Sequence, residues 1–550
     1  MNGFEAIANI LKKEGFEWMA CFPANPLIEA AANAGIRPIV FRQERGGIMA
    51  ADGFSRMLAS QGKRGVFCCQ GGPGVENSFG GIAQAWADSV PILFLPAGDR
   101  DPDIEPNFSA PKNYGQITKW AASINSAEDI PNLMRRAMSA LINGRPGPVL
   151  LEMKGKAMAQ TIDNIDDYSS PQITLSAPHS NDVKNAVTNI INAKNPIIWA
   201  GQGILYSGAT NELKQLVELL QIPILTTMQA KSAFDERHPL SLGSANRTAP
   251  KTVWHWLKES DLILGLGTSW TKTNFAIDIP EGKTLIHNTN NLADISKEYK
   301  TDIGLLGDAK LTLEMLIEET KVQLGSTKRN NDSVIESIAI IKKEWNEEWS
   351  ELLNSDQSPI NPYRLINEFI KAVDHENTII THDAGHPRDQ IMPFYPATVP
   401  HSYIGWGKST HLGYGIGLAI GAKIANPDKF CVNFMGDAAF GMAGLDIETS
   451  VRSGNPITTI VLDNGTMGGY DHHQPVAMSK YGAGNMTGSY TTIAKGLGAV
   501  GIDVDKPEEI GPAIKAAEKA NKEGRSVLIN VKTQQEDKFS ICLLYTSPSP

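Results

Sequence analysis

The stretch from residue 436 to residue 469 constrains the fold of this chain more than any other. An apolar run at residues 430–435 ends in Gly436-Asp437, a helix-compatible segment follows, and a second apolar run at residues 457–462 is followed by Asn464. A strand, a helix and a second strand in this order make a parallel pair. Both strands then end at the same edge of a sheet, where open α/β sheets bind ligands. The sequence therefore predicts that Asp437 and Asn464 are neighbours.

Oxygen atoms at that edge suit a hard cation of the Mg²⁺ type that holds a phosphate group, because such ions prefer oxygen ligands. Each of the two residues, taken alone, is more commonly a turn residue or a helix cap. Together, Gly436-Asp437 and Asp463-Asn464 resemble the thiamine-diphosphate-binding motif of the acetolactate synthase-like enzyme family. The resemblance implies that the metal ligands are Asp437, Asn464 and the carbonyl of Thr466.

Two residues depart from that motif. Ala438 stands where the motif usually has Gly, and Asp463 replaces the first Asn, but neither is a metal ligand in the family pattern. Residue by residue, the resemblance implies that the cofactor contacts are Gly385, His386, Thr410, Leu412, Gly436, Asp437, Ala438, Ala439, Asn464, Thr466, Met467 and Gly468. For His386 an ordinary surface role and a phosphate-donor role are both open.

Residues 1–165 repeat strand-like runs that stop at glycine or proline, which indicates a parallel sheet with helices on both faces. Glu44 follows the second run and opens a helix rich in Gly and Ala, where its plain role would be to complement the helix N-terminus. The segment Ala-Asp-Gly-Phe-Ser-Arg at 51–56, with Gly-Gly-Pro-Gly at 71–74 and Asp-Ser-Val-Pro at 88–91, resembles the catalytic-glutamate region of the same family. The resemblance implies that Glu44 is catalytic.

A glutamate suits the chemistry of thiamine diphosphate, whose thiazolium C2 proton is weakly acidic and must leave. A carboxyl group bonded to the pyrimidine ring raises the basicity of the opposite amino group, which then takes that proton. The carboxyl of Glu44 should therefore sit in a dry site.

A second pair of expected cofactor contacts precedes a Gly-Tyr-Gly helix start at 413–415. In the family, an apolar residue at such a place wedges between the two rings of the cofactor, and Leu412 matches it. The carbonyl of Thr410 would then receive the pyrimidine amino group. Without the other motifs, a leucine that enters a helix would simply be a core residue.

The length of 550 residues exceeds what one core fills and suggests about three domains. The predicted class is α/β, with three doubly wound parallel-sheet domains. These are a pyrimidine-binding domain at 1–165, a central nucleotide-binding-like domain at 185–325 and a diphosphate-binding domain at 358–535. Residues 536–550 form an unassigned tail. A charged helical stretch at 328–354 carries Trp345 and Trp349 as packing anchors.

The central region has a Gly-Gln-Gly turn at 201–203, which could cradle a dinucleotide phosphate or be only a tight turn. In the family this domain sometimes carries FAD. The sequence Gly-Thr-Ser-Trp-Thr-Lys-Thr at 267–273 lacks the Arg-Phe-Asp-Asp-Arg-like cluster that accompanies FAD. FAD is allowed by the resemblance, but an adenine nucleotide or no ligand is expected instead.

Composition excludes other classes of function. The net charge of −10, with no offsetting Lys/Arg stripe, argues against a nucleic-acid surface. No apolar run reaches membrane-spanning length and no signal peptide is visible, so the cytoplasm is expected. Cys68 and Cys69 lie in an apolar run and are predicted to be buried thiols.

We therefore predict an enzyme that uses thiamine diphosphate and Mg²⁺ on a 2-oxo acid or related acyl donor, with acetolactate synthase-like carboligation as the first choice. The alternatives are a decarboxylase of the benzoylformate decarboxylase type, and a lyase similar to oxalyl-CoA decarboxylase or 2-hydroxyacyl-CoA lyase. A non-catalytic cofactor-binding subunit is a further rival, against which Glu44 argues. The resemblance also implies a homodimer or homotetramer in which two chains build each active site.

Overall fold

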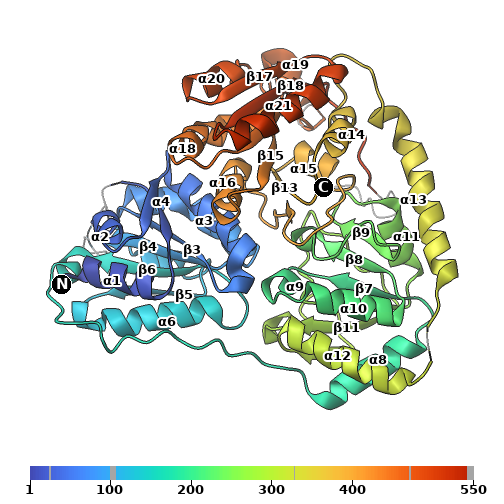
Figure 1. The fold of residues 1–550 in the computed structure, drawn as a ribbon, viewed down its shortest axis with the longest axis horizontal. Helices are drawn as coiled ribbons and strands as arrows, with labels where there is room; N and C mark the ends of the chain where they lie inside the picture. Colours follow the sequence, from blue (N-terminus) through green and yellow to red (C-terminus); the bar gives the residue numbers. More distant parts are fainter. Residues whose placement is uncertain (24–25, 99–103, 105–106, 328, 470–471, 542–550) are drawn as a thin grey trace.

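The computed structural model describes residues 1–23, 26–98, 104, 107–327, 329–469 and 472–541. In these residues the strands form three sheets, each of six parallel strands, and helices cover them (Figure 1). The predicted α/β class with three parallel sheets is confirmed.

The first sheet has the strand order β2-β1-β3-β4-β6-β5. Its strands are β1 (Trp18–Cys21), β2 (Arg37–Val40), β3 (Gly65–Cys69), β4 (Ile92–Gly98), β5 (Trp120–Ile124) and β6 (Val149–Lys154). Its helices are α1 (Gly3–Lys13), α2 (Leu27–Asn33), α3 (Glu44–Leu58), α4 (Pro73–Ala87), α5 (Ala110–Tyr114), α6 (Ile130–Ile142) and α7 (Gly155–Met158).

The central sheet has the order β12-β11-β10-β7-β8-β9. Its strands are β7 (Pro196–Ala200), β8 (Ile224–Thr227), β9 (Ser241–Ala245), β10 (Leu262–Leu266), β11 (Thr284–Thr289) and β12 (Ile303–Leu306). Its helices are α8 (Ser180–Asn192), α9 (Gly203–Tyr206), α10 (Thr210–Leu220), α11 (Lys251–Glu259) and α12 (Ala309–Leu324).

The third sheet has the order β14-β13-β15-β16-β18-β17. Its strands are β13 (Thr378–His382), β14 (Tyr403–Ile404), β15 (Phe430–Gly436), β16 (Thr458–Asp463), β17 (Val500–Val504) and β18 (Val527–Lys532). Its helices are α14 (Pro362–Ala372), α15 (His386–Ile391), α16 (Gly415–Ala425), α17 (Asp437–Ala443), α18 (Ile447–Arg452), α19 (Pro475–Tyr481), α20 (Tyr490–Gly496) and α21 (Ile510–Lys522).

Strands in the middle of each sheet are buried along their whole length, as in β3, β7 and β13. This burial follows from helices on both faces, which is why the parallel strands read as continuous apolar runs rather than alternating ones. The first and third sheets therefore present only their carboxyl edges and loops for binding.

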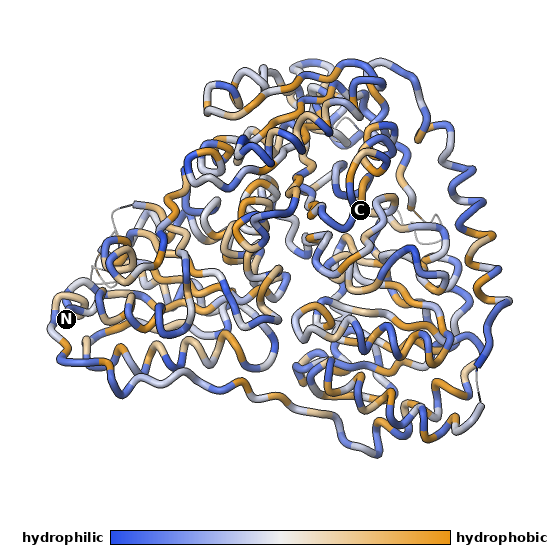
Figure 2. Tube along the Cα trace, viewed as in Figure 1, coloured by the Kyte–Doolittle hydropathy of each residue, from blue (hydrophilic) through white to orange (hydrophobic). Residues whose placement is uncertain are grey.

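A long helix, α13 (Asp332–Leu353), connects the central domain to the third domain along the outer edge of the molecule. Figure 2 shows it as largely hydrophilic with hydrophobic interruptions. Its buried residues include Trp345 and Trp349, and their rings lie against Phe394 at centroid distances of 4.6 and 5.1 Å. The predicted packing role of the two tryptophans is confirmed.

The first and third domains meet through α3 and α16, which lie side by side (Figure 1). Glycines make this approach close. A Cβ on Gly53 would stand 2.9 Å from the Cα of Leu418, and a Cβ on Gly421 would stand 2.7 Å from the amide nitrogen of Phe54. Helix packing at this distance fixes the two domains against each other.

The segment between β15 and β16 is not one helix. The structure divides it into α17 and α18, with a 3₁₀ turn at Gly444–Asp446 between them. The turn places the carboxylate of Asp446 against the first domain, where it accepts the amide of Arg42 at 2.9 Å. The helix-compatible segment is thus helical at both ends and interrupted at this turn.

Cys21, Cys68, Cys69 and Cys431 are buried, and none of these four joins another described residue in a disulfide. Cys542 lies outside the described residues. The prediction of buried thiols at Cys68 and Cys69 is confirmed. Among the described residues, no helix has both the length and the apolar character needed to cross a membrane.

Candidate active site

The predicted metal ligands gather at the carboxyl edge of the third sheet. Strands β15 and β16 pair in parallel with Gly436 opposite Leu462, so Asp437 and Asn464 leave the sheet side by side. One carboxylate oxygen of Asp437 accepts the amide of Ala438 at 2.7 Å, and the other accepts the amide of Gly465 at 3.0 Å. The carboxylate therefore bridges the ends of both strands.

Two aspartates lie at this edge of the sheet, and they differ in how their negative charges are compensated. Asp463 is neutralised by Lys532 and also accepts a hydrogen bond from Asn530 at 3.1 Å. Asp437 is buried and makes no ion pair within the described part of the chain. Its pKa is raised, chiefly because of burial and partly because Asp463 lies near.

This donor set fits Mg²⁺. It comprises a buried carboxylate without a cation, the amide oxygen of Asn464, and the carbonyl of Thr466 within the same loop. The backbone amide of Thr466 donates a hydrogen bond to the side-chain oxygen of Asn464 at 3.1 Å, which orients that side chain. In the described residues no group of three or more His, Cys, Asp or Glu side chains is placed to hold a metal, so a cation here would depend on amide and carbonyl oxygens.

His386 lies against the loop that follows these ligands. A Cβ on Gly468 would stand 2.7 Å from its imidazole, and the ring of Phe539 packs against it at 4.9 Å. Gly385 precedes it with φ of +86°, a conformation that favours glycine, and starts α15. The structure therefore brings Gly385, His386 and Gly468 together beside Asp437 and Asn464.

The loop before α16 carries Thr410 and Leu412. Thr410 adopts a left-handed conformation with φ of +54°, and Leu412 packs against the core between the first and third domains. Asp383 holds the end of this loop, because its carboxylate accepts the amides of Gly413 at 2.8 Å and Gly415 at 2.9 Å. Burial raises the pKa of Asp383 to about 6.

Glu44 is the first residue of α3 and is only 3% exposed, which agrees with the expected dry site. Its carboxylate accepts a hydrogen bond from the side-chain amide of Asn77 at 3.1 Å. The neighbouring Gln43 donates to the carbonyl of Met442, at the far end of the helix that Asp437 begins.

Met442 lies where the segments that carry Glu44, Leu412 and Asp437 come together. It contacts Gln43 from the first domain, and a Cβ on Gly413 would stand 3.0 Å from its own Cβ. The loops of Glu44 and Leu412 therefore lie at one end of α17, and Asp437 lies at the other.

Several residues around the site could not be singled out from the sequence. They are Asn77, Gln84 and Asp446, and the charge pair of Arg56 with Asp88. Arg56 and Asp88 stand in motifs that carry the family resemblance, but the sequence assigns them no task. The sequence also offers the histidines of the segment 470–474 as substrate contacts or as part of a solvated loop. His472 is 70% exposed on its side chain and lies 3.8 Å from Asp537, whereas Tyr470 and Asp471 are outside the described residues.

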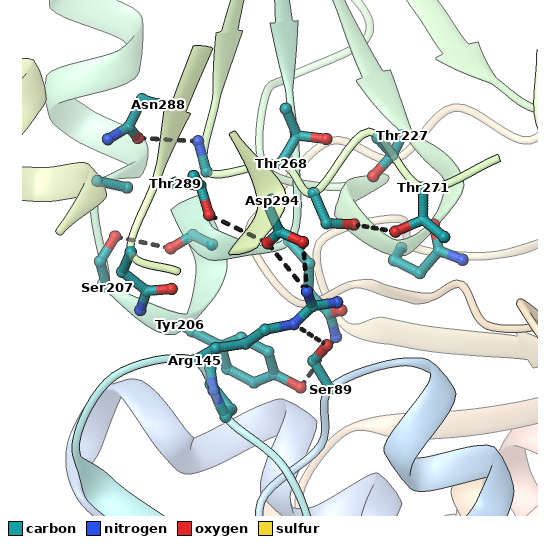
Figure 3. Close-up of a pocket in the computed structure, with 18 of the residues that line it drawn as sticks. Ser89, Arg145, Tyr206, Ser207, Thr227, Thr268, Thr271, Asn288, Thr289 and Asp294 are labelled. Carbon is teal, nitrogen blue, oxygen red and sulfur yellow. Dashed lines mark hydrogen bonds and ion pairs between the residues drawn. The ribbon is translucent and has the colours of Figure 1, made fainter. Parts of the chain in front are cut away.

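A separate cavity of about 370 Å³ lies where the first and central domains face each other, and Gly407 and Lys408 of the third domain close it. Figure 3 shows Arg145 reaching across it from the first domain. Its guanidinium donates to both oxygens of Asp294 at 2.8 and 2.9 Å and to the hydroxyl of Ser89 at 2.8 Å.

Lys408 connects this cavity to the loop that carries Thr410 and Leu412. Its ammonium donates to the hydroxyl of Ser269 at 3.1 Å. Its pKa is lowered to about 8, because burial disfavours the charge and Arg145 repels it, while Asp88 opposes the shift.

The described part of the tail at residues 536–541 packs on the protein. Glu536 accepts a hydrogen bond from Asn361 at 2.8 Å, and the hydroxyl of Ser540 donates to the carbonyl of Ala249 in the central domain. The tail therefore joins the third domain to the central one.

Known proteins resemble this chain over nearly its whole length. Residues 1–116 match the thiamine pyrophosphate enzyme N-terminal TPP binding domain, residues 183–316 match the central domain, and residues 383–531 match the C-terminal TPP binding domain. A probable acetolactate synthase large subunit of Methanococcus aeolicus is 30% identical over 94% of this chain and 90% of its own length. A 2-hydroxyacyl-CoA lyase of Arabidopsis thaliana is 25% identical over 90% of this chain and 88% of its own.

The three parallel sheets, the two loops at the third sheet edge and the buried glutamate thus define a thiamine-diphosphate-dependent enzyme. The chain belongs to the acetolactate synthase-like family of these enzymes.

Proposed function

We propose that this protein is an acetolactate synthase-type carboligase that holds thiamine diphosphate through Mg²⁺. It would release the carboxylate of one 2-oxo acid as CO2 and join the remaining acyl unit to a second 2-oxo acid. The observation that carries the proposal is the convergence of Glu44, Leu412 and the Asp437–Asn464 edge at the two ends of α17. A binding subunit without activity would not need the buried carboxyl of Glu44.

Each residue has a task in this proposal. Asp437, Asn464 and the carbonyl of Thr466 bind the metal, and the backbone of Gly436, Ala438, Ala439, Met467 and Gly468 surrounds the diphosphate with Gly385. His386 would donate to the diphosphate, since its imidazole lies against Gly468 of this loop.

When bound, thiamine diphosphate would supply a nucleophilic carbon for the 2-oxo group. Leu412 would support its two rings, and the carbonyl of Thr410 would accept the pyrimidine amino group. Glu44 holds a proton on the pyrimidine ring, and Asn77 orients its carboxyl. The burial of Glu44 excludes water from this proton exchange.

The second candidate is a lyase that acts on an acyl-CoA, and the interdomain cavity favours it. Coenzyme A carries an adenine nucleotide, and the cavity that could take it includes Lys408, which belongs to the loop that carries Thr410 and Leu412. The similarity to 2-hydroxyacyl-CoA lyase also supports this lyase candidate.

For the cavity itself we propose an adenine nucleotide or no resident cofactor rather than FAD. A volume of about 370 Å³ is near the lower end of the roughly 300–1,000 Å³ of small-molecule sites, which suits a mononucleotide better than a dinucleotide. The indole of Trp270 also forms part of the cavity wall, where it stacks on the ring of His287 at a centroid distance of 4.2 Å.

We also propose an oligomer in which two chains complete each site. The close pairing of α3 with α16 can form within one chain, as here, or between two chains that exchange partners. The cytoplasm remains the proposed location, from composition alone.

A product assay tests the reaction. Purified protein with thiamine diphosphate and Mg²⁺ is given pyruvate, pyruvate with glyoxylate, or a 2-hydroxyacyl-CoA, and products are followed by nuclear magnetic resonance. A new carbon–carbon bond between two 2-oxo acids supports the carboligase. Cleavage of the acyl-CoA alone identifies the lyase, and no conversion of any substrate contradicts both. Glu44→Gln serves as the inactive control.

A further inference from the structure

The loop that carries Thr410 and Leu412 is shaped by two side chains of the first domain, Gln84 and Asp88. The carboxylate of Asp88 accepts the amides of Gly407 at 3.0 Å and Lys408 at 3.1 Å. The amide oxygen of Gln84 accepts the hydroxyl of Ser409 at 3.0 Å and the amide of His411 at 3.1 Å. The two side chains therefore bind the loop on both sides of Thr410.

Both side chains are themselves fixed. Gln84 and Asp88 are 0% exposed, and the amide nitrogen of Gln84 donates to Asp88 at 2.7 Å. Arg56 donates to the same carboxylate at 3.1 Å and to Asp52 at 2.5 Å, so one buried guanidinium holds both carboxylates. A third bond from Arg56 reaches the carbonyl of Gly405 at 3.0 Å, just before the loop.

The backbone conformation of Thr410 depends on these hydrogen bonds. Its φ of +54° is unusual for a residue with a branched side chain, and such a conformation persists only where the surroundings hold it. The bonds to residues 407, 408, 409 and 411 constrain the chain before and after it. They also give partners to the amides of the buried Gly407 and of the half-buried Lys408 and His411.

We propose that Gln84 and Asp88 are positioning residues that fix the carbonyl of Thr410 and the side chain of Leu412 in the arrangement the cofactor's pyrimidine ring requires. This role rests on the proposed function. Both residues belong to the first domain. Docking of that domain therefore determines the conformation of the loop that carries Thr410 and Leu412 in the third domain.

Amide hydrogen exchange on the protein without cofactor gives a direct test. Asp88→Asn replaces one acceptor oxygen by an NH₂ group, and Gln84→Met keeps the shape while removing every hydrogen bond. We expect exchange in the peptide that spans 407–411 to become at least about 10-fold faster in both variants. The matched control is Asp374→Asn, where an exposed aspartate accepts the amides of Glu376 and Asn377 in a distant turn. It should leave this peptide unchanged.

Calorimetry then measures thiamine diphosphate binding in the presence of Mg²⁺. Both variants should bind at least about 10-fold more weakly than wild type. If a buried variant fails to fold, Ser409→Ala removes one of the four bonds from the loop side and should give a smaller change in the same direction.

The outcomes separate this role from the proposed function. Unchanged exchange at 407–411 in folded variants, or faster exchange with unchanged cofactor affinity, would overturn the positioning role alone. Wild-type protein that binds no thiamine diphosphate would overturn the proposed function and this role with it.

Discussion

Replacing Gly53 by alanine is the sharpest test of the pairing between the first and third domains. The new Cβ would stand 2.9 Å from the Cα of Leu418 and nearer still to its carbonyl oxygen, whereas ordinary contact begins at 3.4 Å. Helix α3 must therefore move away from α16 by at least about 0.5 Å, because backbone atoms cannot rotate aside. Glu44 lies nine residues earlier on the same helix, about 14 Å along its axis, and moves with it.

The magnitude follows from these distances. A misplacement of 1 Å in an active site costs up to about 100-fold in rate, so half of that should lower kcat about 10-fold. Stability should change less. Alanine in a helix is favoured over glycine by about 1 kcal/mol, and the crowding costs about 1–3 kcal/mol, so the net loss is about 0–2 kcal/mol.

The assay compares kcat and the free energy of unfolding in urea for Gly53→Ala and Gly511→Ala. Gly511 lies in α21, and no atom of another segment stands within 4 Å of the point that its Cβ would occupy. Alanine there should leave kcat unchanged and stability equal or slightly higher. Equal kcat values for Gly53→Ala and wild type would refute the conclusion that this helix pair sets the position of Glu44.

Four further predictions concern the metal, the central cavity and the assembly. Asp437→Ala should weaken thiamine diphosphate binding by at least about 100-fold, and calorimetry showing unchanged affinity would exclude the metal assignment. Purified protein should be colourless and active without added FAD, and a stoichiometric flavin absorbance band would contradict that expectation. Co-expressed Glu44→Ala and Asp437→Ala chains, purified through two tags, should regain activity because a mixed dimer holds one intact site, whereas mixed dimers as inactive as both parents would place each site within one chain. Lys408 has a folded pKa of about 8 against an ordinary 10.5, so its burial cost is present below pH 8 and lost as the pH rises to 10.5. Lys408→Met should therefore stabilise the protein against urea at pH 7 and less so at pH 10, and an equal effect at both pH values would contradict this cause.

The sequence by itself determined the parallel α/β sheets and the two loops of the third sheet edge. Strand runs such as residues 430–435 carry this information locally, because apolar runs bounded by glycine fix the strand and its end. Parallel pairing then placed Asp437 beside the loop of Asn464 without any further contact being known. The position of Glu44 at the start of a helix was readable for the same reason.

Only the tertiary structure decided how the residues of the first domain and those of the third domain come together at the site. The bond of Asp446 to Arg42, which accompanies the break between α17 and α18, joins residues 404 positions apart, and no local pattern encodes it. The bonds from Gln84 and Asp88 to residues 407–411 likewise cross from one domain to another. Such contacts depend on which glycines allow two helices to approach, and that is a property of packing between distant segments rather than of periodicity along the chain.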